Sequence, residues 1–297
     1  MVALEDSTRQ SPYSDPGRHA ALLGALPGDL ASLCAASRNV IAHYRAELGE
    51  LPPQRRGEVD SRWLEVVLDV DQERHGTGLE RPRVLGDRVA GCCRDHALLV
   101  VGALRQRGVP ARSRVGFAHC FTPGWAHDHV VVERWERGRW RRADPELTAS
   151  AGSFDVLDLP VGDGAPFETA AQAWLGWRAG ERDASRYGVA PGAPWCGPGF
   201  VRDEVLHELA HRHGDELLLW DGWGAVEDPG SLALEEVDEL ARLLVLADGG
   251  DEAAEADLAA RYRGDERLHP GEQVVTRSPF GGPARLVDLA RRSTTPL

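Results

Sequence analysis

The segment from residue 93 to residue 143 constrains the fold most, because its pattern changes once from helix to strand. Apolar residues of the first part recur at the spacing of one helix face. They are Ala97, Val100, Val101 and Leu104. Gly108 stands where a glycine commonly ends a helix, and Pro110 prevents its continuation. The pattern therefore predicts a helix from about Cys93 to Arg107.

Two strands and a hairpin are expected directly after this helix. Residues 112–121 are rich in valine, phenylalanine and cysteine, and residues 129–135 are β-branched and alternating. A turn at 136–138 leads to residues 139–147 (RWRRADPEL), the expected partner of the second strand in a β-hairpin. A helix followed by antiparallel strands favours the α+β class over a doubly wound sheet.

The flanks of this segment are expected to be mainly helical. We expect a loose polar tail at 1–17, a helical part at 18–78, a core at 79–150 and a mostly helical part at 151–297 that is integrated with the core. Asp29 is a candidate N-cap for a helix over 28–48. A second helix is expected to end near residue 73. Further helices are expected near 167–180, 200–220, 231–247 and 252–263, and a strand is expected at 273–276. No linker interrupts the pattern, so one compact unit is expected.

The charge of the chain limits its partners. The net charge of −13 argues against nucleic acid or an anionic membrane as the main partner. All 34 basic residues are arginine, which is more typical of codon bias than of function. No apolar run approaches the length of a membrane helix, and the first residues do not resemble a secretory signal. A cytoplasmic location is therefore expected.

Cys93 is the candidate nucleophile among five cysteines, an odd number that argues against a disulfide framework. It lies where the predicted helix begins, and the free N–H groups and dipole of a helix N-terminus favour an anion. A thiol at such a place has a lowered pKa, and the thiolate is the reactive form. Backbone N–H groups there can also hold an oxyanion.

Two further residues complete a possible triad. His129 opens the second expected strand, and its imidazole could pair with the thiolate and then protonate a leaving amine. Asp144 lies on the next expected strand of the hairpin, so that it could orient the imidazole by a hydrogen bond. Cys93, His129 and Asp144 are therefore the candidate catalytic residues.

Several short motifs occur together between about residues 82 and 147. They are Cys93-Arg94-Asp95-His96-Ala97, Gly108-Val109-Pro110-Ala111-Arg112, Gly116-Phe117, a His129-to-Glu133 strand, Trp140, and Asp144-Pro145. In this combination and order they resemble the transglutaminase-like superfamily. Later segments resemble a bacterial branch of the superfamily more loosely.

The resemblance implies a papain-like α+β core and acyl transfer through a thioester, without cofactor or metal. The family motif places the nucleophile directly before Arg-Asp, which selects Cys93 over Cys92. The expected substrate is a peptide or a small-molecule amide, and an amine could serve as acceptor. A non-catalytic binding protein with the same fold is an alternative.

A second alternative is a zinc peptidase. The sequence HELAH at 207–211 matches H-E-x-x-H, in which His207 and His211 would bind zinc and Glu208 would act as general base. The third ligand is not evident, although Glu235 or Glu236 could supply it. The same segment is equally compatible with an ordinary solvated helix face.

Overall fold

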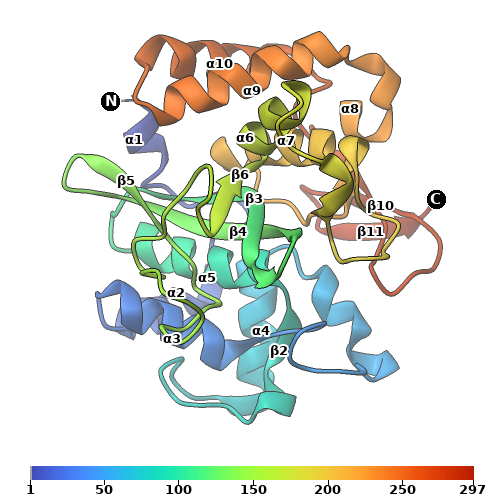
Figure 1. Cartoon of the computed structure of the whole chain (residues 1–297). Helices are drawn as coiled ribbons and strands as arrows, with labels where there is room; N and C mark the ends of the chain where they lie inside the picture. Colours follow the sequence, from blue (N-terminus) through green and yellow to red (C-terminus); the bar gives the residue numbers. More distant parts are fainter. Residues whose placement is uncertain (1) are drawn as a thin grey trace. The chain divides into compact units, whose positions relative to one another are not determined.

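The chain divides into two compact units in the computed structural model, which describes the backbone of residues 2–297 and the side chains of residues 4–297. Unit 1 holds residues 2–114 and 130–160, and unit 2 holds residues 115–129 and 161–297 (Figure 1). Two of the crossings lie inside long strands, β3 (Ala111–Thr122) and β4 (Trp125–Glu136). Because these boundaries fall within strands, no linker in the sequence marks them. One compact unit was expected for that reason.

Unit 1 is built around α5, every residue of which is buried. The helices of unit 1 are α1 (Val2–Asp6), α2 (Ala20–Ala25), α3 (Leu30–Val40), α4 (Leu64–His75) and α5 (Cys93–Arg105), with short 3-10 helices at Gly17–His19, Pro53–Asp60 and Leu85–Asp87. Helices α2, α3 and α4 all pack on α5 (Figure 1). Gly108 follows α5 with a φ of +69°, which is the conformation expected of a glycine that ends a helix.

Helix α3 begins as expected and ends earlier. The Asp29 side chain accepts a hydrogen bond from the Ser32 N–H at 2.9 Å, so that it caps the helix. The helix stops at Val40 because β1 (Ile41–His43) pairs in parallel with β2 (Val89–Gly91). This pairing between distant segments overrides the helical pattern that predicted a helix to residue 48.

Tyr13 and Ser14, in the segment 1–17 that was expected to be a loose tail, are buried and hydrogen-bonded. Tyr13 is 3% exposed and its carbonyl accepts from the Leu64 N–H at 2.8 Å. The Ser14 hydroxyl, fully buried, accepts from Arg105 at 2.9 Å. Polar residues buried by such bonds cannot be recognised from composition.

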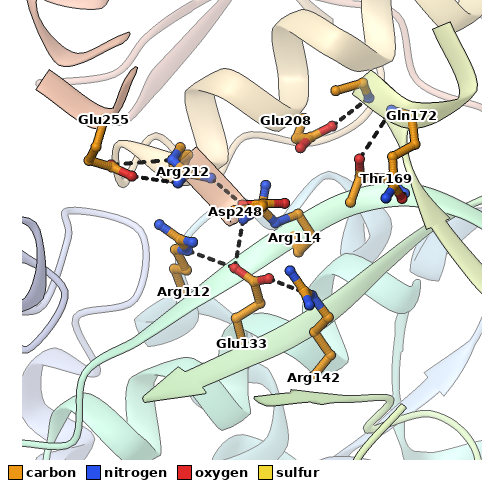
Figure 2. Close-up of polar contacts among 11 residues, drawn as sticks. Arg112, Arg114, Glu133, Arg142, Thr169, Gln172, Glu208, Arg212, Asp248 and Glu255 are labelled. Atoms are coloured by element: carbon orange, nitrogen blue, oxygen red, sulfur yellow. Dashed lines mark hydrogen bonds and ion pairs between the residues drawn. The ribbon is translucent and has the colours of Figure 1, made fainter. Parts of the chain in front are cut away.

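The strands β4 and β5 (Arg139–Ala143) form the expected hairpin in unit 1. A buried ionic cluster centred on Glu133 fixes it. The Glu133 carboxylate accepts from Arg112 at 2.7 Å, Arg114 at 2.8 Å and Arg142 at 2.7 Å (Figure 2). The Arg112 guanidinium also lies 4.1 Å from the ring centroid of Trp140. Arginines from β3 and β5 thus converge on one carboxylate of β4.

Unit 2 combines a layer of helices with two groups of strands. Its longer helices are α6 (Ala170–Arg178), α7 (Pro198–Arg212), α9 (Leu234–Asp248) and α10 (Glu252–Gly264), with the short helices α8 (Gly224–Glu227), Ala184–Arg186 and Pro229–Ser231. Helix α6 packs on both α7 and α9, and α10 packs on α9 (Figure 1). In this unit β6 (Phe167–Thr169) pairs antiparallel with β3, and β7 (Tyr187–Gly188) pairs in parallel with β4.

Gly116 on β3 explains one motif residue. A Cβ there would lie 2.2 Å from the carbonyl oxygen of Glu168 and 2.7 Å from the Phe167 ring. Only glycine allows β6 to pair this closely with β3.

A second sheet closes the C-terminal part, which was expected to be mostly helical. Its strand order is β11–β10–β9–β8, with β8 at Asp221–Gly222, β9 at Gln273–Thr276, β10 at Arg285–Asp288 and β11 at Ser293–Pro296. Only β9 was predicted. The expected α+β class is confirmed, with an antiparallel sheet and helices that are consistent with a transglutaminase-like core. Within the described residues, no helix has the length and apolar character needed to cross a membrane.

Candidate active site

Cys93 is the first residue of α5, directly after the N-cap Cys92. The start of the helix is fixed by Asp95, whose Oδ2 accepts from the Cys92 N–H at 2.9 Å. Arg94 donates to Asp95 Oδ1 at 2.9 Å and to the carbonyl of Arg62 at 2.5 Å. Burial raises the pKa of the Asp95 carboxyl, against the lowering by Arg94 and the Cys92 N–H. The Arg-Asp pair after Cys93 is therefore a clamp on the helix N-terminus.

Gly91 serves this clamp as well. A Cβ at this position would lie 2.7 Å from Asp95 Oδ2 and 3.0 Å from Ile41 Cγ2. The glycine thus makes room for the protein's own carboxylate and an isoleucine methyl.

Asp144 directly follows β5 in unit 1 and is 1% exposed. Its Oδ1 accepts from the backbone N–H groups of Glu146 at 3.0 Å and Leu147 at 3.2 Å. Arg38 on α3 donates to the carbonyls of Pro145 at 2.7 Å and Leu147 at 3.1 Å. The turn that carries Asp144 is therefore tied to α3 by a residue that the sequence analysis did not identify.

We expect Arg38→Met to destabilise the protein by about 1.5–3 kcal/mol, because two hydrogen bonds from a charged donor to this turn are lost. Urea unfolding measures the change. Arg81→Met is a matched control, since the Arg81 side chain is 75% exposed and lies 3.7 Å from Glu80. Its expected cost is below about 0.5 kcal/mol. Equal costs for the two variants would contradict the role of Arg38 in holding this turn.

His129 lies on β4 and is 2% exposed. It is the last residue of the segment 115–129 of unit 2. Its ring centroid is 5.2 Å from that of Phe121 and 6.5 Å from that of Phe167. Three residues further along β4, Val132 pairs with Ala143, the residue before Asp144. Cys93 and Asp144 thus belong to unit 1 and His129 to unit 2, on a strand that is shared by both.

Three other motif residues, Arg112, Glu133 and His96, make buried contacts with residues outside the candidate triad. Arg112 and Glu133, which both belong to the motifs above, bind one another in the buried cluster. Burial alone would raise the pKa of Glu133, but Arg114, Arg112 and Arg142 hold it well below its usual range. His96 on α5 is buried, with its Nδ1 3.4 Å from the Ser37 hydroxyl.

The family comparison can now be set beside this geometry. The model described as "Transglutaminase-like superfamily" matches residues 49–145. These residues are a transglutaminase-like domain. The resemblance inferred from the motifs is thereby confirmed over about a third of the chain. The transglutaminase-like domain includes Cys93, His129 and Asp144.

One similar solved structure is described as a "putative cysteine protease" from Cytophaga hutchinsonii. It is 19% identical, with a TM-score of 0.31, over 48% of this chain and 42% of that chain. The matched part thus spans less than half the length of that protein. No curated protein matches the chain.

The alternative zinc motif lies on α7, where all three of its residues are buried. Glu208 accepts from the Ala171 N–H at the start of α6 at 2.7 Å (Figure 2). His211 Nε2 lies 3.1 Å from the Leu217 carbonyl oxygen. Burial lowers the pKa of His207 to about 4, so its ring is neutral at pH 7. The three motif residues are thus part of the buried face of α7, and the Glu208 carboxylate accepts a hydrogen bond from the N-terminus of α6.

No third ligand completes a metal site on α7. Within residues 4–297, no three or more His, Cys, Asp or Glu side chains are grouped so that they could hold a metal ion. The Glu236 carboxylate binds Arg267 at 2.9 Å, and the Glu235 side chain is 80% exposed. The two glutamates considered as ligands are thus engaged or directed to solvent.

We expect Glu208→Ala to cost about 1–2 kcal/mol of stability, because it removes an acceptor from the α6 N-terminus. A chelator should leave the melting temperature of the wild-type protein unchanged. Differential scanning fluorimetry with and without EDTA measures both effects. A large fall in melting temperature on chelation, restored by zinc, would instead support a metal at His207 and His211.

Proposed function

We propose that the protein is a thiol-dependent acyltransferase or amide hydrolase that acts through a thioester on Cys93. The observation that carries the proposal is the position of Cys93 as the first residue of a buried helix in a transglutaminase-like domain. Free N–H groups at a helix start favour a thiolate. Among the described residues, none of the five cysteines forms a disulfide, so the Cys93 sulfur is not consumed in a bridge.

In the first half-reaction, the Cys93 thiolate attacks the carbonyl carbon of an amide. The carbonyl oxygen becomes an oxyanion, for which we propose backbone N–H groups at the start of α5 as donors, other than the Cys92 N–H that binds Asp95. The C–N bond then breaks, and the imidazolium of His129 gives its proton to the leaving amine. Asp144 would hold the ring and stabilise its charged form.

The second half-reaction resolves the thioester. Water or a second amine attacks the acyl carbon while neutral His129 takes its proton, and the C–S bond breaks to restore the thiolate–imidazolium pair. Water gives hydrolysis and an amine gives transfer. We propose a peptide or small-molecule amide as acyl donor. The net charge of −13 favours a cationic or neutral one.

Trapping the acyl-enzyme tests this function without knowledge of the natural substrate. The full chain is mixed with p-nitrophenyl acetate, quenched in acid and digested for mass spectrometry. The proposal expects one acetyl group on Cys93, removed faster by added glycine amide if the enzyme is a transferase and by water alone if it is a hydrolase. Acetylation spread over several cysteines at equal rates would contradict the proposal.

A further inference from the structure

Phe121 lies against the imidazole of the proposed base. Its ring is 5.2 Å from that of His129, centroid to centroid, at an interplanar angle of 78°. It also lies 5.8 Å from the ring of His127 at 76°. Phe121 is nevertheless 41% exposed. Exposure alone means little for a single apolar residue, so the contacts must carry the argument.

The end of the β3–β4 hairpin that carries Phe121 is hydrogen-bonded within unit 2. The His127 ring binds the Thr122 hydroxyl through Nε2 at 2.9 Å and the Val189 carbonyl through Nδ1 at 3.0 Å. The Trp125 indole N–H donates to the Gly188 carbonyl at 3.1 Å. The bonds to Gly188 of β7 and to the adjoining Val189 both come from β4, and the Thr122–His127 bond ties β3, which carries Phe121, to β4. Phe121 therefore packs against His127, whose ring is held by two hydrogen bonds.

A second aromatic ring is close to His129 as well. Phe167, the first residue of β6, is 1% exposed and lies 6.5 Å from the His129 ring at 66°. The imidazole thus has one buried and one half-exposed phenylalanine around it. Edge-to-face aromatic pairs are worth about 0.5–1.5 kcal/mol beyond the area that they bury. That is enough to favour one orientation of the imidazole over its alternatives.

We propose that Phe121 is a positioning residue of the acyl-transfer site. Its ring keeps the His129 imidazole in the orientation at which it exchanges a proton with the Cys93 sulfur and the leaving amine. This inference rests on the proposed function. A proton-transferring group must be aligned within hydrogen-bond reach, so a ring that turns away is lost as a base even when its pKa is unchanged.

The test compares Phe121→Leu, Phe121→Tyr and a surface control, Leu246→Ala, whose side chain is 50% exposed on α9. The rate of Cys93 alkylation by iodoacetamide is measured between pH 5 and 9. Phe121→Leu should slow alkylation at pH 6 by about 3- to 10-fold, as expected for loss of one aromatic pair. Phe121→Tyr keeps the ring and should retain the wild-type profile, as should Leu246→Ala.

Melting temperatures and the imidazole NMR signals separate positioning from general damage. The Phe121→Leu variant should melt within a few degrees of the wild type while its His129 ring signals broaden or shift. If wild-type Cys93 is labelled fast and Phe121→Leu shows the same alkylation profile and the same ring signals as the wild type, this result would overturn the role of Phe121 alone. Equal losses in the Leu and Tyr variants would do the same. Slow labelling of wild-type Cys93 below pH 7 would overturn both proposals.

Discussion

Replacing Cys93 with alanine is expected to abolish acetyl transfer from p-nitrophenyl acetate, a loss on the order of a thousandfold or more in rate. Without the sulfur at the start of α5, no nucleophile remains in front of the N–H groups that would hold the oxyanion. Stopped-flow absorbance of p-nitrophenol gives the rate, and mass spectrometry gives the site of any remaining acetyl group.

The neighbouring thiol provides a matched control. Cys92 is as buried as Cys93, at 5% exposure each, but it occupies the N-cap with an extended backbone (φ −135°, ψ −172°). Cys92→Ala should keep the rate within about threefold of the wild type, since an adjacent buried thiol serves mainly for packing. A Cys92→Ala variant as inactive as Cys93→Ala would show that the nucleophile had been assigned to the wrong residue.

The largest expected effect on stability comes from Glu133→Gln, about 3–5 kcal/mol. Glu133 is fully buried, and its carboxylate is shared by the guanidinium groups of three arginines. The amide keeps the shape of the side chain but removes the charge that balances them. Urea unfolding followed by tryptophan fluorescence measures the loss.

Glu136→Gln, three residues from Glu133 in sequence and on the same strand, is the control for the cluster. The Glu136 carboxylate also accepts from two arginines, Arg134 and Arg141, but its side chain is 30% exposed. Exposed ion pairs contribute about 0–1 kcal/mol, so a small loss is expected. A loss for Glu133→Gln no larger than this would contradict the proposed importance of the buried cluster.

The same cluster sets a pH dependence with a definite sign. Because the folded-state pKa of Glu133 lies well below its unfolded value, its contribution to stability is present above that unfolded value. The contribution is lost as the pH falls through the lowered folded-state pKa. The loss of stability caused by Glu133→Gln should therefore be full well above pH 4.5, the ordinary pKa of a glutamate, and should shrink as the pH falls below it, which urea unfolding at several pH values measures.

Local patterns were sufficient to predict the elements that carry the candidate residues. Helix α5 ends at Arg105, close to the predicted 107, because its apolar face, Gly108 and Pro110 act within one stretch of chain. The β4–β5 hairpin has the same local origin. The start of α3 follows from Asp29, whereas its end depends on pairing with Val89–Gly91, almost fifty residues away.

The remainder required contacts that single-sequence patterns do not contain. Strands β8, β10 and β11 have two to four residues each, too few to show an alternation of apolar and polar residues. Arg38 reaches Pro145 and Leu147 across more than a hundred residues, so no motif could indicate it. Asp95 was part of a recognised motif, but its role as a cap on Cys92 depends on the backbone geometry at the helix start.

The most direct test of the central claim is the pH dependence of Cys93 alkylation by iodoacetamide, with labelled cysteines located by mass spectrometry. Cys34 is an internal reference, since burial raises its pKa to about 12. Fast labelling of Cys93 below pH 7, slowed in His129→Ala, is the result predicted for a thiolate–imidazolium pair. Labelling of Cys93 that begins only near pH 8.5, the value of an ordinary thiol, and that is indifferent to His129→Ala would contradict it.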